Sequence, residues 1–209
     1  MISALDALAR LRDGNRRFVV DVKSRETLPS RARRIELAAG QEPFAAILGC
    51  SDSRVPVEIV FDQGLGDLFV IRVAGNIVAP SQVGSVEFAA EKFGTRLVVV
   101  LGHSNCGAIQ ATLDQLQRPT ANQSRNLRSI VEFIRPSVED LLQTDLVHDV
   151  DALVHQSVRA NIRASVNHLR RGSEIIEQQI RNGGLLVVGA EYSLDTGVVD
   201  FFDGVPEEG

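Results

Sequence analysis

Both cysteines of the chain lie in short polar segments that contain a second potential metal ligand. Asp52 follows Cys50 by two residues, and His103 precedes Cys106 by three. Two thiolates and one imidazole, with a carboxylate or a water in the fourth position, suit tetrahedral zinc. Thiolate ligands also favour softer metals over magnesium and calcium. The pattern therefore favours one zinc ion per chain.

Other interpretations of these residues stay open. The two thiols could be inert and buried, or they could form one disulfide. Cys106 could act as a nucleophile with His103 as its base. A zinc ion could be structural, with four firmly held ligands, or catalytic, with three protein ligands and one open position. Zinc is favoured because each cysteine follows a predicted strand together with a second ligand.

Asp52 and Arg54 are two residues apart. At this spacing a turn can bring the guanidinium to the carboxylate as a bidentate ion pair. The simpler interpretation is an ordinary ion pair at a turn. In the functional interpretation, Arg54 holds Asp52 off the metal, which frees a coordination position for water. Zinc lowers the pKa of such a water towards neutrality and generates hydroxide.

The elements around these segments predict an α/β fold. Runs that are apolar on both faces are typical of buried parallel strands, and they occupy Phe44–Leu48, Leu68–Val73, Leu97–Leu101 and Leu185–Val188. Helical patterns alternate with them, over Gln82–Phe93, Ala108–Leu116, Asn126–Gln143, Val150–Leu169 and Glu174–Arg181. An edge strand is expected at Val198–Phe202. We expect a mainly parallel central sheet flanked by helices, with a helical insertion before the last strands.

The first part of the chain predicts an amphipathic helix over residues 4–20, with Ala4, Leu8, Leu11 and Phe18 on one stripe. This helix could be an arm that packs on a partner subunit, or it could pack on its own domain. Residues 22–30 have the polar composition of a linker, and a second short helix is expected at residues 31–39.

Composition limits the classes of partner. The chain has 209 residues, and 22 Lys and Arg against 27 Asp and Glu give a net charge of −5. Such a balance disfavours nucleic acid and anionic lipid. The longest clean apolar runs, such as 97–101, are far shorter than the ~20 residues of a membrane-spanning helix. We therefore expect a cytoplasmic protein without a nucleic-acid or membrane partner.

Two segments, Cys50–Pro56 and His103–Gly107, resemble the two signature segments of the beta-class carbonic anhydrases. Asp67–Asn76 and Tyr192–Gly197 also resemble that family. The resemblance spans residues 40–202. It implies a zinc lyase that interconverts carbon dioxide with bicarbonate and a proton through zinc-bound hydroxide. It also implies a homodimer or a dimer of dimers in which N-terminal helices embrace the neighbour.

The resemblance thus describes one domain over residues 1–209, with an N-terminal helical arm at 1–30 and a catalytic core at 40–202. It assigns Cys50, His103 and Cys106 as zinc ligands, and Asp52 as a fourth ligand or as the partner of Arg54. It also assigns four residues to the substrate pocket: Gln41, Phe69, Ala74 and Phe88. Plant-like members have a tyrosine where this chain has Phe88, so a hydroxyl is lost there.

One further departure concerns regulation. Bicarbonate-inhibited members have a tryptophan three residues before the first zinc cysteine, where this chain has Ile47. The other two residues of that inhibitory site match Arg72 and Tyr192. We expect inhibition through this site to be weak or absent. Two alternative functions remain: a hydrolase of carbon disulfide type on the same scaffold, and a zinc-binding module without turnover.

Overall fold

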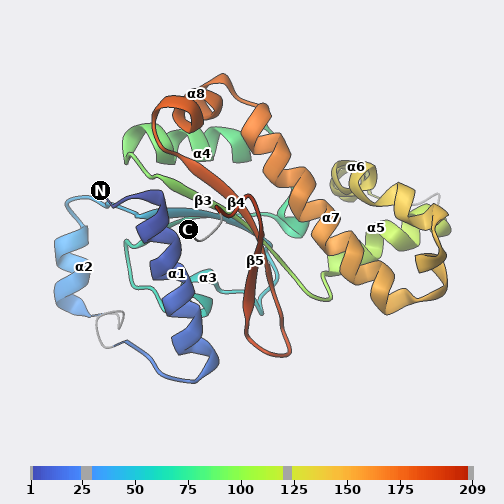
Figure 1. Cartoon of the computed structure of the whole chain (residues 1–209), viewed down its shortest axis with the longest axis horizontal. Helices are drawn as coiled ribbons and strands as arrows, with labels where there is room; N and C mark the ends of the chain where they lie inside the picture. Colours follow the sequence, from blue (N-terminus) through green and yellow to red (C-terminus); the bar gives the residue numbers. More distant parts are fainter. Residues whose placement is uncertain (1, 25–29, 120–123, 207–209) are drawn as a thin grey trace.

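Five strands form a single sheet in the computed structural model, which describes residues 2–24, 30–119 and 124–206 (Figure 1). The strand order is β2-β1-β3-β4-β5; the first four strands are parallel and β5 is antiparallel to β4. The strands are β1 Ala45–Gly49, β2 Leu68–Arg72, β3 Leu97–His103, β4 Leu186–Tyr192 and β5 Val199–Asp203. The mainly parallel sheet and the antiparallel edge strand confirm the predicted fold class.

Helices cover both faces of this sheet. They are α1 Ala4–Val19, α2 Arg31–Leu37, α3 Val57–Val60, α4 Pro80–Lys92, α5 Gly107–Gln117, α6 Arg125–Val138, α7 Val150–Arg171 and α8 Glu174–Asn182. Three short 3-10 helices are also described: η2 Ala74–Asn76, η3 Glu139–Gln143 and η4 Asp145–His148. No helix in the described part of the chain is long and apolar enough to cross a bilayer.

The strands are apolar on both faces because each face has its own hydrophobic core. Along β1, Ala46 and Leu48 contribute to the core formed with α4, α5, α6, α7 and α8. The alternating Ala45 and Ile47 contribute to the core formed with α1 and α3. This alternation of side chains is the geometry of a strand buried on both sides.

Helix α1 packs on its own chain. Ser3 caps the helix by accepting a hydrogen bond from the Asp6 amide. Leu8 and Leu11 lie in the core beneath it. The side-chain Nδ2 of Asn15 donates a hydrogen bond to the Val60 carbonyl oxygen at 3.2 Å. These contacts correspond to the own-domain alternative for the apolar stripe of α1, and the arm at residues 1–30 stays a prediction. By contrast, α2 has no buried residue, and residues 25–29 of the predicted linker lie outside the described residues.

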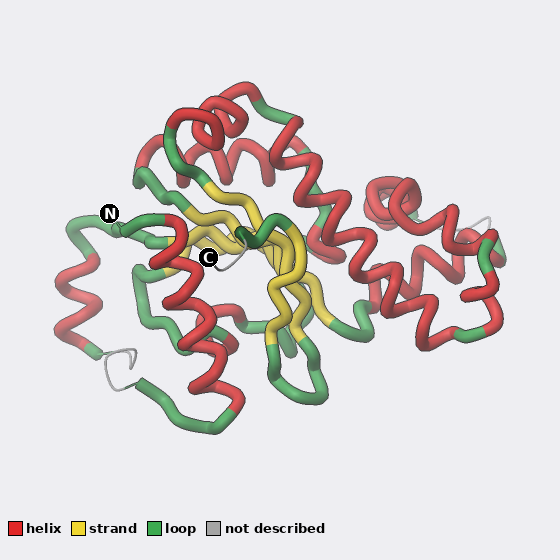
Figure 2. The backbone as a smooth tube through the Cα atoms, in the orientation of Figure 1, coloured by secondary structure: helices red, strands yellow, loops and turns green. Residues whose placement is uncertain are grey.

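The predicted helical insertion lies between β3 and β4. Figure 2 shows its helices extending beyond the sheet. The single helix expected at 126–143 is divided: α6 ends at Val138 and η3 follows. Pro136 lies in the last turn of α6, and a proline there has no N–H for the helical hydrogen bond. The helix expected at 174–181 is α8, and Ser173 caps it by accepting a hydrogen bond from the Ile176 amide.

Candidate metal centre

Two adjacent strand ends and one helix start bring the predicted ligands together. Cys50 follows β1, His103 ends β3, and Cys106 immediately precedes α5. Because β1 and β3 are neighbouring parallel strands, their carboxyl ends meet at one edge of the sheet. The candidate ligand atoms of Cys50, His103 and Cys106 all lie within 4.8 Å of one another, and all three residues are buried.

The donor set fits a zinc ion. The Nδ1 atom of His103 lies 2.9 Å from the Ser104 carbonyl oxygen. With its proton on Nδ1, the imidazole leaves the Nε2 lone pair for a metal. That Nε2 is buried without a hydrogen-bond partner among the described residues. A buried nitrogen without a partner beside two thiols is the arrangement that a soft cation satisfies.

The two thiols differ in acidity. The hydrogen bond from Cys106 is the main cause that lowers the pKa of Cys50 to about 4, with smaller contributions from His103 and the Gly75 amide, against the opposing effect of burial. The pKa of Cys106 is raised by that same hydrogen bond and by burial. Both are free thiols, so the structure does not show the disulfide alternative. A divalent cation favours both groups as thiolates.

Asp52 is paired with Arg54 beside the cluster. The Arg54 Nε donates to Asp52 Oδ1 at 3.0 Å, and Nη2 donates to Oδ2 at 2.8 Å. This bidentate hydrogen bond lowers the pKa of Asp52 well below its usual range. Asp52 Oδ2 lies 3.8 Å from His103 Nε2. The carboxylate therefore stands next to the metal position while its orientation is set by Arg54.

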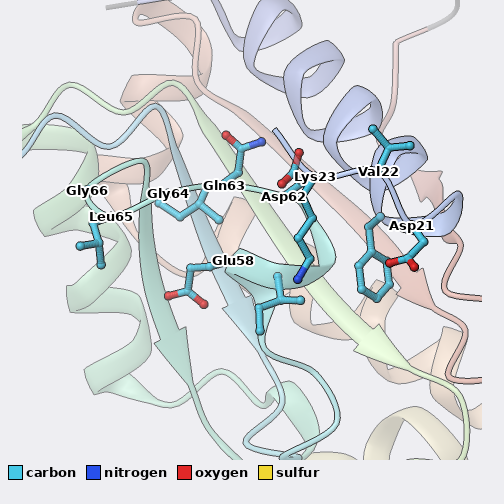
Figure 3. Close-up of a pocket in the computed structure, with 12 residues that line it drawn as sticks. Asp21, Val22, Lys23, Glu58, Asp62, Gln63, Gly64, Leu65 and Gly66 are labelled. Atoms are coloured by element: carbon cyan, nitrogen blue, oxygen red, sulfur yellow. The ribbon is translucent and has the colours of Figure 1, made fainter. Parts of the chain in front are cut away.

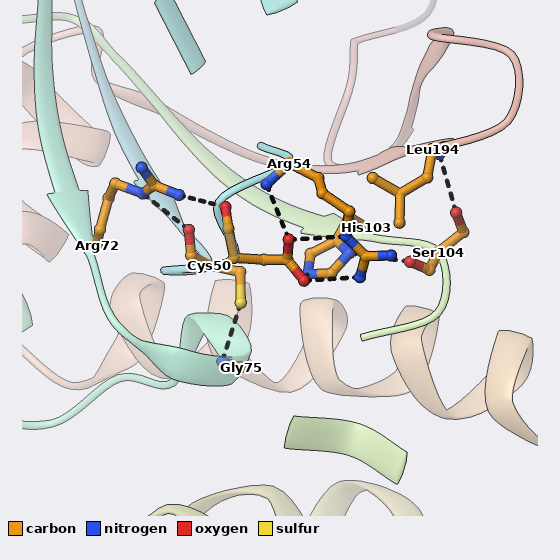
Figure 4. A network of polar contacts seen from close by, with 8 residues as sticks. Cys50, Arg54, Arg72, Gly75, His103, Ser104 and Leu194 are labelled. Atoms are coloured by element: carbon orange, nitrogen blue, oxygen red, sulfur yellow. Dashed lines mark hydrogen bonds and ion pairs between the residues drawn. The ribbon is translucent and has the colours of Figure 1, made fainter. Parts of the chain in front are cut away.

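A short turn after β2 also contacts the cluster. The Gly75 amide donates to Cys50 Sγ at 3.4 Å, and Figure 4 shows this contact below the thiol. Gly75 has φ +70°, and a Cβ there would lie 2.8 Å from Ile134 Cδ1. Glycine is required by both the backbone conformation and the space. Sequence reasoning did not assign Gly75, although its place directly after a predicted strand end is the same signal that identified Cys50.

The predicted pocket residues lie at opposite ends of strands β1 and β2. Ala74 adjoins Gly75 and therefore lies beside Cys50. Phe69 is in register with Ala46, four positions before Cys50, which is about 13 Å along a strand. Phe88 packs on Phe69, with ring centroids 6.2 Å apart.

Gln41 is exposed and precedes β1. Since the thiol cluster follows β1, the strand separates the two in sequence and in space. Within one chain, the structure brings Ala74 to the cluster and leaves Gln41, Phe69 and Phe88 towards the amino ends of β1 and β2.

A surface hollow of about 550 Å³ lies elsewhere, between the end of α1 and the segment from α3 to β2 (Figure 3). Its lining includes Lys23, Glu58 and Leu65. None of the predicted site residues lines it. The chemistry-bearing residues gather instead in a buried cluster, which a single metal ion would fill.

The comparisons with known proteins agree with this geometry. A family model described as carbonic anhydrase matches residues 45–199. The chain belongs to the carbonic anhydrase family. It is similar to carbonic anhydrase 2 of Mycobacterium tuberculosis, with 41% identity over 189 residues, which is 90% of this chain and 87% of the relative. It is also 34% identical to a carbonic anhydrase of Pseudomonas aeruginosa, covering 92% of this chain and 86% of that protein.

Solved structures place this carbonic anhydrase in the beta class. The beta-carbonic anhydrase CafA of Aspergillus fumigatus matches with a TM-score of 0.73 and 25% identity, over 83% of this chain and 82% of that one. A tetrameric beta-carbonic anhydrase of Sordaria macrospora matches with a TM-score of 0.70 and 26% identity, over 81% of this chain and 85% of that one. The chain is thus a beta-class carbonic anhydrase enzyme.

Proposed function

We propose that this carbonic anhydrase hydrates carbon dioxide reversibly with one zinc ion per chain, held by Cys50, His103 and Cys106. The observation that carries the proposal is the buried Cys–His–Cys cluster, whose ligand atoms lie within 4.8 Å of one another. When bound in such a site with an open position, zinc supplies hydroxide at neutral pH by lowering the pKa of water.

The pairing of Asp52 with Arg54 favours a catalytic over a structural site. A structural zinc site holds four firm ligands, whereas Arg54 occupies both carboxylate oxygens of the nearest candidate fourth ligand. Asp52 instead accepts a hydrogen bond from the attacking water and orients its lone pair towards carbon dioxide. Arg54 keeps the carboxylate ionised and in position. This role for Asp52 disfavours the module without turnover.

The pocket residues support an assembly of at least two copies. Ala74 contributes to an apolar wall beside Cys50 from within the same chain. For Gln41 and Phe69 to line that pocket, a second copy must present them, because they lie towards the other end of β1 and β2. There Gln41 donates a hydrogen bond to bicarbonate, and Phe69 with Phe88 provides apolar surface for carbon dioxide.

We infer a role in assembly for α2, which directly follows the arm predicted at residues 1–30. Helix α1 buries its apolar residues on its own chain, while α2 buries none and leaves Ile35 65% exposed. We infer that α2 packs on the neighbouring subunit in a homodimer or a dimer of dimers. The similar enzymes of Sordaria macrospora are tetrameric. Two cysteine ligands need a reducing compartment, which favours the cytoplasm.

Stopped-flow carbon dioxide hydration together with a zinc assay tests the proposal. We expect stoichiometric zinc in the unsubstituted protein, and a loss of kcat/KM of at least ~10-fold in Asp52→Asn and in Arg54→Ala with zinc retained. The matched controls are Glu177→Gln and Arg181→Ala, which break an exposed ion pair on α8 and should leave hydration unchanged.

Two results would contradict this function. Full zinc without hydration between about pH 6 and pH 9, where a zinc-activated water ionises, would favour the module without turnover. Hydrolysis of carbon disulfide without hydration of carbon dioxide would favour the alternative hydrolase.

A further inference from the structure

Three polar side chains are buried along one face of α7. Ser157, Asn161 and Ser165 are spaced four residues apart and are 0%, 2% and 5% exposed. Residues four apart in a helix lie one above the other on the same face. Buried polar groups destabilise a fold unless they are hydrogen-bonded. For these three polar side chains we therefore expect hydrogen-bond partners in the structure packed against α7.

Two of these side chains hold the turn η2. The Asn161 Nδ2 atom donates to the Gly75 carbonyl oxygen at 2.8 Å. The Ser165 hydroxyl donates to the Asn76 carbonyl oxygen at 3.0 Å. On its other side, the amide of Gly75 donates to Cys50 Sγ. A continuous line of hydrogen bonds therefore runs from the middle of α7 through one glycine to a candidate zinc ligand.

The turn places two successive residues in the left-handed region of the backbone. Gly75 has φ +70° and Asn76 has φ +44°, and a left-handed conformation is uncommon for a residue other than glycine. The Asn76 side chain does not hold the turn through its own Nδ2, which is buried without a partner among the described residues. The two hydrogen bonds from α7 are thus the polar contacts that fix the carbonyl groups of residues 75 and 76.

We propose that Asn161 is a positioning residue of the metal centre, which fixes Gly75 so that its amide donates to the Cys50 thiolate. The proposal rests on Cys50 being a zinc ligand, as the proposed function has it. An N–H···S hydrogen bond orients the sulfur lone pairs and stabilises their negative charge. Partners in the outer shell of a metal site tune affinity in this way. Asn161 itself contacts neither the metal position nor the substrate.

Metal binding to purified variants gives the first test. We expect Asn161→Ala to lower zinc affinity by ~10-fold or more in competition with a chelator. The thiolate-to-metal charge-transfer band of the cobalt(II) protein should shift to longer wavelength, because a thiolate without its N–H donor releases electrons more easily. Ser157→Ala is the matched control, since it removes a buried hydroxyl of the same helix face that has no partner among the described residues.

Asn161→Ser repeats the test with a smaller, polar side chain in case the alanine variant does not fold. Ser165→Ala should change zinc affinity less than either, because Ser165 holds the neighbouring carbonyl. Wild-type zinc affinity and an unshifted cobalt band in a folded Asn161 variant would overturn the proposal.

A second measurement uses the unsubstituted protein and does not depend on how a variant folds. With NMR-active cadmium in the site, the hydrogen bond should transmit a scalar coupling between the metal and the Gly75 amide proton. Absence of this coupling would also overturn the proposal. Failure of the proposed function and failure of the Asn161 proposal are distinguishable. An unsubstituted protein that binds no zinc and hydrates no carbon dioxide refutes the proposed function. Normal zinc and hydration with no effect at Asn161 refute only its positioning role.

Discussion

At the scale of single residues, Arg72 beside the candidate metal centre uses its guanidinium to hydrogen-bond backbone carbonyl groups. Its Nε donates to the Cys50 carbonyl oxygen at 2.9 Å, and its Nη2 donates to the Asp52 carbonyl oxygen at 2.6 Å. These bonds brace the segment that bears both the first thiol and the carboxylate. Two of its donor groups are thereby used in holding the backbone.

Because Arg72 matches a residue of the bicarbonate-inhibitory site, its hydrogen bonds to the backbone lead to a prediction about regulation. Ile47, where bicarbonate-inhibited members have tryptophan, is fully buried in the core beneath α1 and offers no donor to an anion. We expect that preincubation with bicarbonate at constant pH produces no slow loss of hydration activity. Stopped-flow rates after increasing preincubation times measure this, with chloride at equal ionic strength as the control. A slow, bicarbonate-dependent lag would contradict the prediction.

The Cys–His–Cys cluster was predictable from sequence because its members follow strands. Cys50 and His103 end apolar runs that read as parallel strands, and parallel strands place their carboxyl ends at one edge. The Asp52–Arg54 pair was predictable because both partners lie within one turn. Asn161 was not, because its contact with Gly75 joins positions 86 residues apart. Its only local signal is the four-residue spacing of polar residues beside an apolar helical stripe.

At the scale of elements, the packing of α7 on the sheet depends on glycine in β3. A Cβ at Gly102 would lie 2.5 Å from Ile162 Cδ1, so the helix approaches the strand more closely than a methyl group allows. We expect Gly102→Ala to lower the free energy of unfolding by about 1–3 kcal/mol through overpacking. Chemical denaturation of the variant measures this.

Ile162→Ala should cost less stability in the Gly102→Ala background than in the unsubstituted protein, because it removes both atoms that the added Cβ approaches, Cδ1 at 2.5 Å and Cγ1 at 2.7 Å. Gly84→Ala provides the control: Gly84 lies within α4, nothing stands within 4 Å of its added Cβ, and alanine is the better helix former. Equal destabilisation at positions 84 and 102 would show that the close approach of α7 is not the cause.

Some helices and strands could be predicted from sequence patterns, and others could not. Apolar runs predicted the four parallel strands, because burial on both faces leaves a signal in most of their residues; the edge strand β5 contains Asp200 and Asp203 and is only partly buried. Helix α3 is four residues long, too short for a periodic pattern. The turn η2 was also missed, since its shape comes from the left-handed backbone of Gly75 and from contacts with α7. Pro136 carried a local signal for the end of α6, and the long helical pattern around it obscured that signal.

At the scale of the whole molecule, the proposed second copy can be tested by mixing two defective subunits. Arg54→Ala impairs the metal side of the site, and Gln41→Ala impairs the pocket side. In a site shared between copies, a hybrid dimer contains one site in which both residues are intact. Since half of randomly formed dimers are hybrids, activity should recover to about a quarter of the wild-type value.

Each variant alone, taken through the same unfolding and reassembly, is the control for this experiment. The Gln41 side chain is exposed, so its removal should not disturb the fold. If Gln41 served the cluster of its own chain, every site in the hybrid would keep one defect. Mixing would then give no more activity than the average of the two variants.

The distribution of the ligands along the chain also bears on how the protein matures. Cys50 follows β1 and Cys106 immediately precedes α5, and the chain between them forms α3, β2, η2, α4 and β3. His103 and Cys106 are close in sequence, and the pairing of β1 with β3 brings Cys50 to them in the folded chain. In small zinc modules the ion drives folding itself. Here the three candidate ligands come together only through the pairing of β1 with β3, so we expect binding of one ion by all three to require an assembled sheet.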